Sequence, residues 1–143
     1  MNDTTETLTV TPLGSGQEVG RSCHYLTYKE SKVLLDCGIH PGYSGVDGLP
    51  FFDRIEPSEV EVLLITHFHL DHAAALPHFT ERTGFKGRIF MTHPTKAVIK
   101  LLLTDYLRLM SINSADKPDE DVLYTEEELK SCLDKVELID YHR

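Results

Sequence analysis

Apolar and polar residues alternate along the first part of the chain in a pattern that predicts paired strands. Residues 8–13 (LTVTPL) alternate in this way, which predicts a strand with one face buried. Pro12 cannot donate a backbone hydrogen bond, so this strand should lie at an edge of a sheet or end there. Residues 23–28 and 32–36 predict two further strands, paired around a turn at residues 29–31.

A near-continuous apolar run, residues 60–65 (VEVLLI), predicts a strand buried on both faces of a sheet. Good helix-forming residues follow at 73–76, and Pro77 either limits that helix or starts a new one. Residues 88–92 predict the next strand, and residues 136–141 begin another. Early strands followed by strand–helix units indicate an α/β protein.

Two more helices are predicted from spacing and capping. Apolar residues recur with helical spacing from Val98 to Met110, and Thr92 or Thr95 can cap the start of that helix. Residues 125–128 (TEEE) match a capping box, which predicts the start of another helix. The helix dipole explains the acidic first turn of this helix, so no binding site is inferred there.

The segment from residue 39 to residue 57 is rich in glycine and proline, which predicts a loop. A loop of this length in a compact domain favours a functional or packing role. Phe51 and Phe52 are expected to anchor it to the core. His40 and His78 belong to no ligand motif, and structural roles are expected for both.

Composition narrows the possible functions. The formal net charge of −9 is the wrong sign for a free-standing nucleic-acid binder, so any RNA-binding surface lies elsewhere or the chain does not bind RNA by itself. Cys23, Cys37 and Cys132 form no C-x-x-C pair and are odd in number, which predicts small core residues in a reducing compartment. No signal sequence and no membrane-spanning run is found, so a cytosolic or nuclear protein with no membrane contact is expected.

Four polar side chains follow the apolar run 60–65 within a few residues. His67 and His69 are two residues apart on an extended loop, so both can reach one cation, whereas Asp71 and His72 follow as the helix begins and point towards a second. The carboxyl end of a buried strand is where open α/β sheets place their sites. Imidazole and carboxylate suit Zn²⁺ and related ions, and two metals roughly 3.5–4 Å apart can clamp a phosphoryl oxygen. Ordinary polar loop residues would explain one isolated histidine, but they explain this cluster poorly.

The cluster His67-Phe-His69-Leu-Asp71-His72 resembles the signature of the metallo-β-lactamase superfamily. Four motifs, in order, resemble its β-CASP RNA nuclease branch: residues 11–22 (TPLGSGQEVGRS), 35–41 (LDCGIHP), 65–77 (ITHFHLDHAAALP) and 91–96 (MTHPTK). Within that branch the chain resembles the endonucleases that cleave pre-mRNA before polyadenylation. A sister nuclease in the Integrator complex shares much of the pattern, but residues 39–42 (IHPG) and 49–53 (LPFFD) favour the polyadenylation enzymes.

This resemblance implies an α/β fold that is the N-terminal part of a metallo-β-lactamase αββα sandwich, incomplete in this chain. Residues 1–7 would be a polar tail and residues 8–143 a partial domain, with the β-CASP domain absent. The implied function is zinc-dependent endonucleolytic cleavage of pre-mRNA 3′ ends in the nucleus, by metal-assisted hydrolysis. The implied partners are pre-mRNA and the other subunits of the cleavage and polyadenylation complex.

The resemblance also implies roles for individual residues. His67, His69, Asp71 and His72 would hold two Zn²⁺ ions, and Asp36 and Asp71 would be the catalytic carboxylates. The family aspartate that matches Asp36 lies beside the metals and orients a ligand. From its sequence position alone, Asp36 is as well explained as a cap on the turn that follows its strand.

Three alternatives stay open at this point. They are an Integrator-type endonuclease, another metallo-β-lactamase-fold hydrolase such as a thioesterase or lactonase, and a non-catalytic RNA-processing subunit or fragment. Non-catalytic relatives have lost ligands of the histidine motif, whereas all four are present here. Counting ligands further predicts that these 143 residues alone are not an active enzyme, because each cation would have two protein ligands and a catalytic zinc keeps about three.

Overall fold

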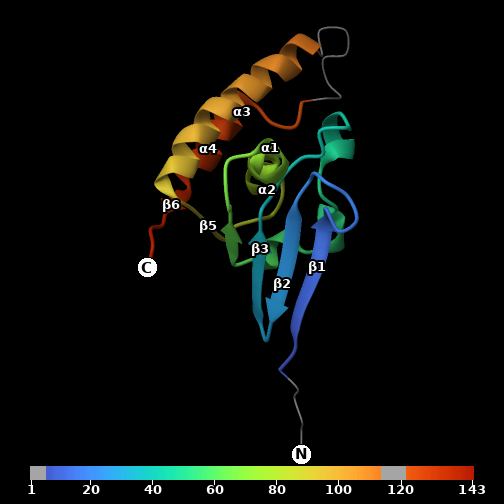
Figure 1. Cartoon of the computed structure of the whole chain (residues 1–143), viewed down its shortest axis with the longest axis vertical. Coiled ribbons are helices and arrows are strands. Elements are labelled where there is room, and N and C mark those ends of the chain that lie inside the picture. Colours follow the sequence, from blue (N-terminus) through green and yellow to red (C-terminus); the bar gives the residue numbers. More distant parts are fainter. Residues whose placement is uncertain (1–5, 114–121) are drawn as a thin grey trace, which may run out of the picture.

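The computed structural model describes residues 6–113 and 122–143, which build a six-stranded mixed sheet flanked by helices (Figure 1). The strands lie side by side in sequence order; β1 pairs with β2 and β2 with β3 in antiparallel fashion, and the strands from β3 to β6 pair in parallel. The α/β fold predicted from the sequence is therefore confirmed. The strands are β1 Leu8–Gly14, β2 Cys23–Tyr28, β3 Ser31–Leu35, β4 Val62–Leu64, β5 Arg88–Met91 and β6 Val136–Leu138.

Local sequence signals mark the starts of α2, α3 and α4, whereas α1 begins at Leu70, before the helix-forming residues 73–76. Pro77 lies in the first turn of α2, so it starts a new helix and does not limit an earlier one. α3 begins directly after Thr92, which leaves Thr95 inside its first turn. Both halves of the capping box between Thr125 and Glu128 are formed at the start of α4. The α-helices of the described residues are α1 Leu70–Ala73, α2 Leu76–Arg82, α3 His93–Asn113 and α4 Glu126–Asp134.

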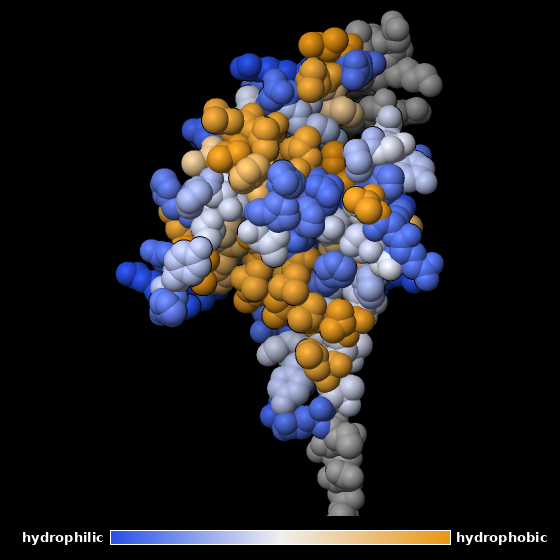
Figure 2. Space-filling model, in the orientation of Figure 1, coloured by the Kyte–Doolittle hydropathy of each residue, from blue (hydrophilic) through white to orange (hydrophobic). Residues whose placement is uncertain are grey.

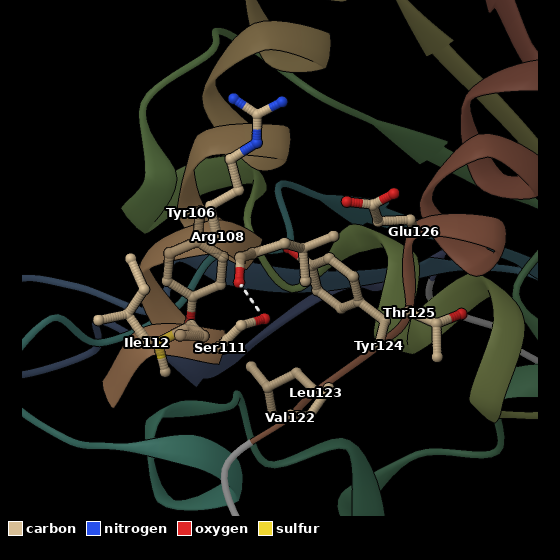
Figure 3. Close-up of a pocket in the computed structure, with 11 residues that line it drawn as sticks. Tyr106, Arg108, Ser111, Ile112, Val122, Leu123, Tyr124, Thr125 and Glu126 are labelled. Carbon is tan, nitrogen blue, oxygen red and sulfur yellow. Dashed lines mark hydrogen bonds between the residues drawn. The ribbon is translucent and has the colours of Figure 1, made fainter. Parts of the chain in front are cut away.

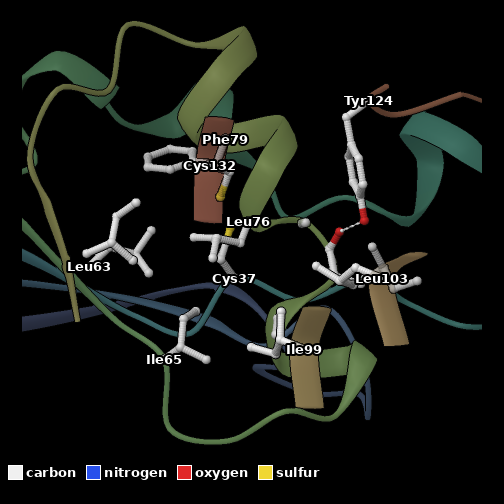
Figure 4. Packing of buried hydrophobic residues seen from close by; sticks show 14 of the residues in the cluster. Cys37, Leu63, Ile65, Leu76, Phe79, Ile99, Leu103, Tyr124 and Cys132 are labelled. Carbon is white, nitrogen blue, oxygen red and sulfur yellow. Dashed lines mark hydrogen bonds between the residues drawn. The ribbon is translucent and has the colours of Figure 1, made fainter. Parts of the chain in front are cut away.

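The helices cover one face of the sheet and form the core with it. Leu34, Leu63, Ile89 and Val136 are aligned across the parallel strands by their register, and all four are buried. Figure 4 shows side chains from α2, α3 and α4 packed together with those that follow the central strands. The three cysteines are free and buried in this core, as predicted.

The other face of the sheet presents a partly open apolar surface. Val62 and Leu64 of β4 are only half-buried, so the prediction of a strand buried on both faces is wrong. Leu8 and Val10 of β1 are 58% and 55% exposed, so the buried face predicted for that strand is wrong over most of its length. The described helices pack on the opposite face, and alternate side chains of the strands therefore meet no second layer among the described residues. Figure 2 shows the hydrophobic patch that results on this face.

The glycine- and proline-rich segment is folded into short turns of helix. Phe52 packs against Phe79, with ring centroids 4.8 Å apart, and anchors the segment as expected. Phe51 is 47% exposed, so its predicted anchoring role is wrong. The guanidinium groups of Arg21 and Arg54 lie 4.9 and 5.7 Å from its ring centroid, and these cation–π contacts hold the ring at the surface. The 3-10 helices here are η1 Gly45–Gly48, η2 Phe52–Arg54 and η3 Pro57–Glu59.

The sheet ends at β1 on one side and at β6 on the other. The position of β1 agrees with the expectation raised by Pro12, and β6 forms the opposite edge. β6 is shorter than the predicted strand 136–141. Within residues 6–113 and 122–143, no helix is both long enough and apolar enough to cross a membrane.

Candidate metal centre

The predicted ligands lie at the carboxyl edge of the parallel strands. Leu35 ends β3 and Leu64 ends β4, and the two residues pair across the parallel register. The segments that follow these strands therefore leave the sheet side by side. The Asp36 amide donates to the Leu64 carbonyl oxygen at 2.8 Å, which extends the ladder by one bond. This pairing brings Asp36 to Thr66 and to the histidines that follow it, although Asp36 and Thr66 are 30 residues apart.

The short helix α1 carries Asp71 and His72 and is tied to neighbouring segments through its backbone. The Ser22 amide donates to the Asp71 carbonyl oxygen at 2.9 Å, and the Cys37 amide donates to that of His72 at 2.8 Å. Gly38 lies so close to α1 that a Cβ atom there would be 1.7 Å from the Asp71 carbonyl oxygen. Sequence reasoning missed Ser22 and Gly38; a glycine two residues after a strand-ending aspartate was the one available signal.

Asp36 is 5% exposed and has a φ of 63°, a left-handed conformation that aspartate adopts more readily than most residues. Its Oδ1 accepts a hydrogen bond from the Thr66 amide at 2.7 Å, and its Oδ2 lies 2.8 Å from the Thr66 hydroxyl. Nδ1 of His72 lies 2.9 Å from the same Oδ2. Because an ionised carboxylate only accepts hydrogen bonds, Nδ1 of His72 carries the proton in this contact. Asp36 is thus in direct contact with one of the predicted ligands.

The two predicted ligand pairs adjoin in one cluster. The ring centroids of His67 and His69 are 4.8 Å apart, and Asp71 Oδ2 lies 3.5 Å from His72 Nε2. The His67 ring also lies 4.1 Å from the His72 ring, so the second pair does not point away from the first. In the part of the chain that the structure describes, ligand atoms of Asp36, His67 and His72 lie within 4.8 Å of one another. His69 and Asp71 flank this group without belonging to it.

The arrangement fits a divalent cation beside His72. With the proton of Nδ1 directed to Asp36, a neutral His72 ring has its lone pair on Nε2. Nε2 lies 3.5 Å from Asp71 Oδ2, so two acceptor atoms lie close together. Two such atoms repel, and a cation between them turns the contact into an attraction. Imidazole and carboxylate both suit Zn²⁺, whereas both oxygens of Asp36 are already engaged by Thr66 and His72.

Two histidines outside the cluster have structural partners. Nδ1 of His40 accepts a hydrogen bond from the Gly42 amide at 3.0 Å. Nδ1 of His78 lies 3.0 Å from the Leu123 carbonyl oxygen, and burial lowers the pKa of the His78 ring. Both were expected to be structural, and neither is recruited to the candidate centre.

Two hollows differ in their relation to this cluster. A hollow of about 510 Å³ lies between the last turns of α3 and residues 122–126 (Figure 3). Apolar side chains such as Leu107 and Leu123 line it, and it shares no residue with the cluster. A smaller hollow of about 280 Å³ is lined by Asp71 together with Ile39 and Tyr43 of the loop. This smaller hollow therefore adjoins the candidate centre.

Comparisons with known proteins point to one family. A family model described as the metallo-beta-lactamase superfamily matches residues 16–137. Cleavage and polyadenylation specificity factor subunit 3-I of Arabidopsis thaliana is 55% identical over 136 residues, which cover 95% of this chain and 19% of the relative. Cleavage and polyadenylation specificity factor 73 of Drosophila melanogaster is 50% identical over 141 residues, with coverage of 99% and 20%. Endoribonuclease YSH1 of Saccharomyces cerevisiae is 52% identical over 133 residues, with coverage of 91% and 17%. The chain thus spans about a fifth of the length of these curated relatives.

Proposed function

Because this chain belongs to the metallo-β-lactamase superfamily, whose members depend on metal, we propose that it carries the histidine motif of an RNA endonuclease that cleaves pre-mRNA 3′ ends before polyadenylation. One observation carries the proposal: the rings of His67 and His72 come together after β4, and His72 Nε2 lies 3.5 Å from a carboxylate oxygen of Asp71. The relatives described above are named as an endoribonuclease and two cleavage and polyadenylation specificity factors, and this likeness supports RNA as the substrate.

The proposed ligands follow the two pairs of the cluster. His67 and His69 would hold one Zn²⁺, and Asp71 and His72 would hold a second. When bound, the two cations supply an activated water and offset the charge that develops on the scissile phosphate. Asp36 fixes the orientation of the His72 ring through Nδ1 and so leaves Nε2 as the ligand atom. Asp36 therefore acts on the reaction by positioning, and Asp71 acts as a ligand.

The proposed partners are pre-mRNA and the other subunits of the cleavage and polyadenylation complex, and the proposed location is the nucleus. A protein that neutralises RNA phosphates does so with lysine and arginine side chains. The formal net charge of this chain is −9. We therefore expect other parts of the endonuclease, or its partner subunits, to supply most of the phosphate contacts.

The test places this chain in a working endonuclease. The matching segment of Endoribonuclease YSH1 of Saccharomyces cerevisiae is replaced by this chain, and the zinc-loaded chimera, with that relative's own partners, is given a labelled pre-mRNA. We expect cleavage that leaves a 3′-hydroxyl on the upstream product. Asp71→Ala and His72→Ala should each abolish cleavage, because each removes a ligand, and should change the melting temperature of the metal-free protein little. Asp134→Ala, which removes an exposed carboxylate at the end of α4, is the matched control and should cut normally. The assignment would be wrong if the double variant of Asp71 and His72, supplied with zinc, cut RNA about as well as the unmutated chimera.

A second test concerns the 143 residues by themselves. The proposed centre gives each cation two protein ligands, fewer than the three or so of a catalytic zinc, so we expect weak zinc retention and no RNA cleavage. The chain is purified, dialysed against metal-free buffer and assayed for bound zinc and for cutting of a labelled RNA. Two tightly held zinc ions per chain, with metal-dependent cutting, would show that the ligand count is wrong.

A further inference from the structure

Thr66 connects two residues of the candidate centre that lie far apart in sequence. Its hydroxyl oxygen is 3.0 Å from Asp36 Oδ1 and 2.8 Å from Asp36 Oδ2, and it is also 2.8 Å from His67 Nδ1. We propose that Thr66 is a positioning residue. Its hydroxyl oxygen accepts a hydrogen bond from the protonated Nδ1 of His67, so that Nε2 is the atom with which this ring can bind a cation. The inference rests on the proposed function, because the cation is the one assigned there to His67.

The directions of these hydrogen bonds follow from the chemistry of the three groups. A hydroxyl has one proton and two lone pairs, whereas an ionised carboxylate can only accept. If the hydroxyl proton pointed to His67, the Thr66 oxygen would face both oxygens of the buried Asp36 carboxylate with no hydrogen between them. The proton therefore points to Asp36, and the lone pairs of the hydroxyl face His67. Only a protonated Nδ1 satisfies that contact, so a neutral His67 has its lone pair on Nε2.

The Asp36 carboxylate thereby fixes the tautomers of two imidazole rings, those of His67 and His72. Asp36 acts on His72 by a direct contact with Nδ1 and on His67 through the Thr66 hydroxyl. Both rings present Nε2, and their centroids are 4.1 Å apart. Without the hydroxyl, Nδ1 of His67 loses its acceptor. The tautomer that has its proton on Nε2, and therefore no ligand atom there, then becomes populated.

Nitrogen-15 NMR of the metal-free chain tests the inference, because the shifts of the ring nitrogens report which one is protonated. In the unmutated chain we expect the proton on Nδ1 of both His67 and His72. Thr66→Val keeps the branched shape without the hydroxyl, and it should move the His67 proton towards Nε2 while leaving His72 unchanged. Thr66→Ser should restore the first pattern. Thr104→Val is the matched control, since it removes a hydroxyl that is bonded to the Lys100 carbonyl oxygen at 2.7 Å on α3.

Metal affinity gives a second readout. Thr66→Val should bind zinc about 10–100-fold more weakly in competition with a chelator, as is typical when the group that orients a ligand is removed, and Thr66→Ser should not. Measured on the chimera described above, this readout also covers the case in which the isolated variant does not stay folded.

The proposal is overturned by a proton on Nε2 of His67 in the unmutated chain. An unchanged His67 tautomer in Thr66→Val also overturns it, as does zinc binding by the Thr66→Val chimera that matches the Thr66→Ser chimera. The tautomers are read without metal or RNA, so a chimera that fails to cut RNA counts against the proposed function and not against the role of Thr66.

Discussion

Replacing Gly38 by alanine should loosen the candidate metal centre without touching any of its ligands. A Cβ atom at this position would lie 1.7 Å from the carbonyl oxygen of Asp71 and 2.6 Å from the amide nitrogen of His72. Both are backbone atoms of α1, so no flexible side chain can turn aside. The short helix itself has to move away from the segment that follows β3.

The loss of stability in Gly38→Ala can be estimated from the hydrogen bonds that this movement of α1 breaks. The amides of Ser22, Cys37 and Ile39 donate to carbonyl oxygens of α1. Each backbone hydrogen bond contributes about 1 kcal/mol net, so losing the set costs about 3 kcal/mol. Overpacking of a close-packed site gives a similar figure of about 1–3 kcal/mol. We therefore expect Gly38→Ala to lower the free energy of unfolding by about 2–3 kcal/mol, which a domain with a typical stability of about 5–15 kcal/mol survives.

Urea denaturation measures this change, and Gly84→Ala is the matched control. The nearest side-chain atom to a Cβ at Gly84 is Ser58 Cβ at 3.6 Å, an ordinary contact, so its unfolding free energy should stay within about 0.5 kcal/mol of wild type. Cobalt titration should show weaker binding in Gly38→Ala alone, because Asp71 and His72 move with α1. Equal unfolding free energies for the two variants would refute the reasoning that this backbone contact positions the helix.

Three further predictions concern single groups. Asp36→Asn should weaken cation binding about 10–100-fold in a metal titration, because the amide can donate to Nδ1 of His72 and so favour the wrong tautomer; a lowered melting point with unchanged affinity would favour the role of turn cap. The hydrogen bonds from Arg82 lower the pKa of Glu128 to about 2, so its carboxylate stabilises the fold fully above the unfolded pKa near 4.5 and loses this contribution as the pH falls towards about 2. Urea melts of Glu128→Gln should therefore differ from wild type at neutral pH and converge with it in strong acid, and a constant difference would contradict this. Burial raises the pKa of every cysteine thiol, so iodoacetamide should label none in the native chain and all in urea, as counted by mass spectrometry; native labelling would show that the core opens. These thiols belong to Cys23, Cys37 and Cys132.

The position of the histidine cluster could be predicted because its signals are local. An apolar run, four ligand-type residues and a helix-forming stretch follow one another within residues 60–76. In the structure the apolar run becomes β4, the ligand-type residues lie on the loop and on α1, and the helix-forming stretch links α1 to α2. The resemblance placed Asp36 beside a ligand, but the residues alone could not predict its contacts, because these depend on β3 pairing in parallel with β4 across 30 residues. No local pattern reports such a pairing, which is why the role of the Thr66 hydroxyl was missed; for Gly38 the one local signal was its place two residues after Asp36.

The wrong predictions of burial for β4 and Phe51 also arose because burial depends on contacts between segments that are distant in sequence. The apolar residues of β4 indicate that its side chains avoid water, but they do not indicate which layer covers them. The described helices pack over Leu63, while Val62 and Leu64 point to the opposite face and stay half-exposed. The prediction that Phe51 packs into the core was wrong for a related reason. An aromatic ring can be held at the surface by a neighbouring arginine, and the sequence does not show which of the two partners it has.

The parallel pairing of β3 with β4 also has a kinetic consequence. Parallel strands need a crossover, so Asp36 and Thr66 meet only after a long loop has closed, and such distant contacts form slowly. A cation held beside His72 would bind the folded state alone and, at a concentration one hundred times its Kd, would add about 2.7 kcal/mol to stability. If these contacts are absent from the transition state, that gain appears as slower unfolding and not as faster folding, which stopped-flow traces with and without zinc would show. The supply of metal would then govern how long each folded molecule lasts.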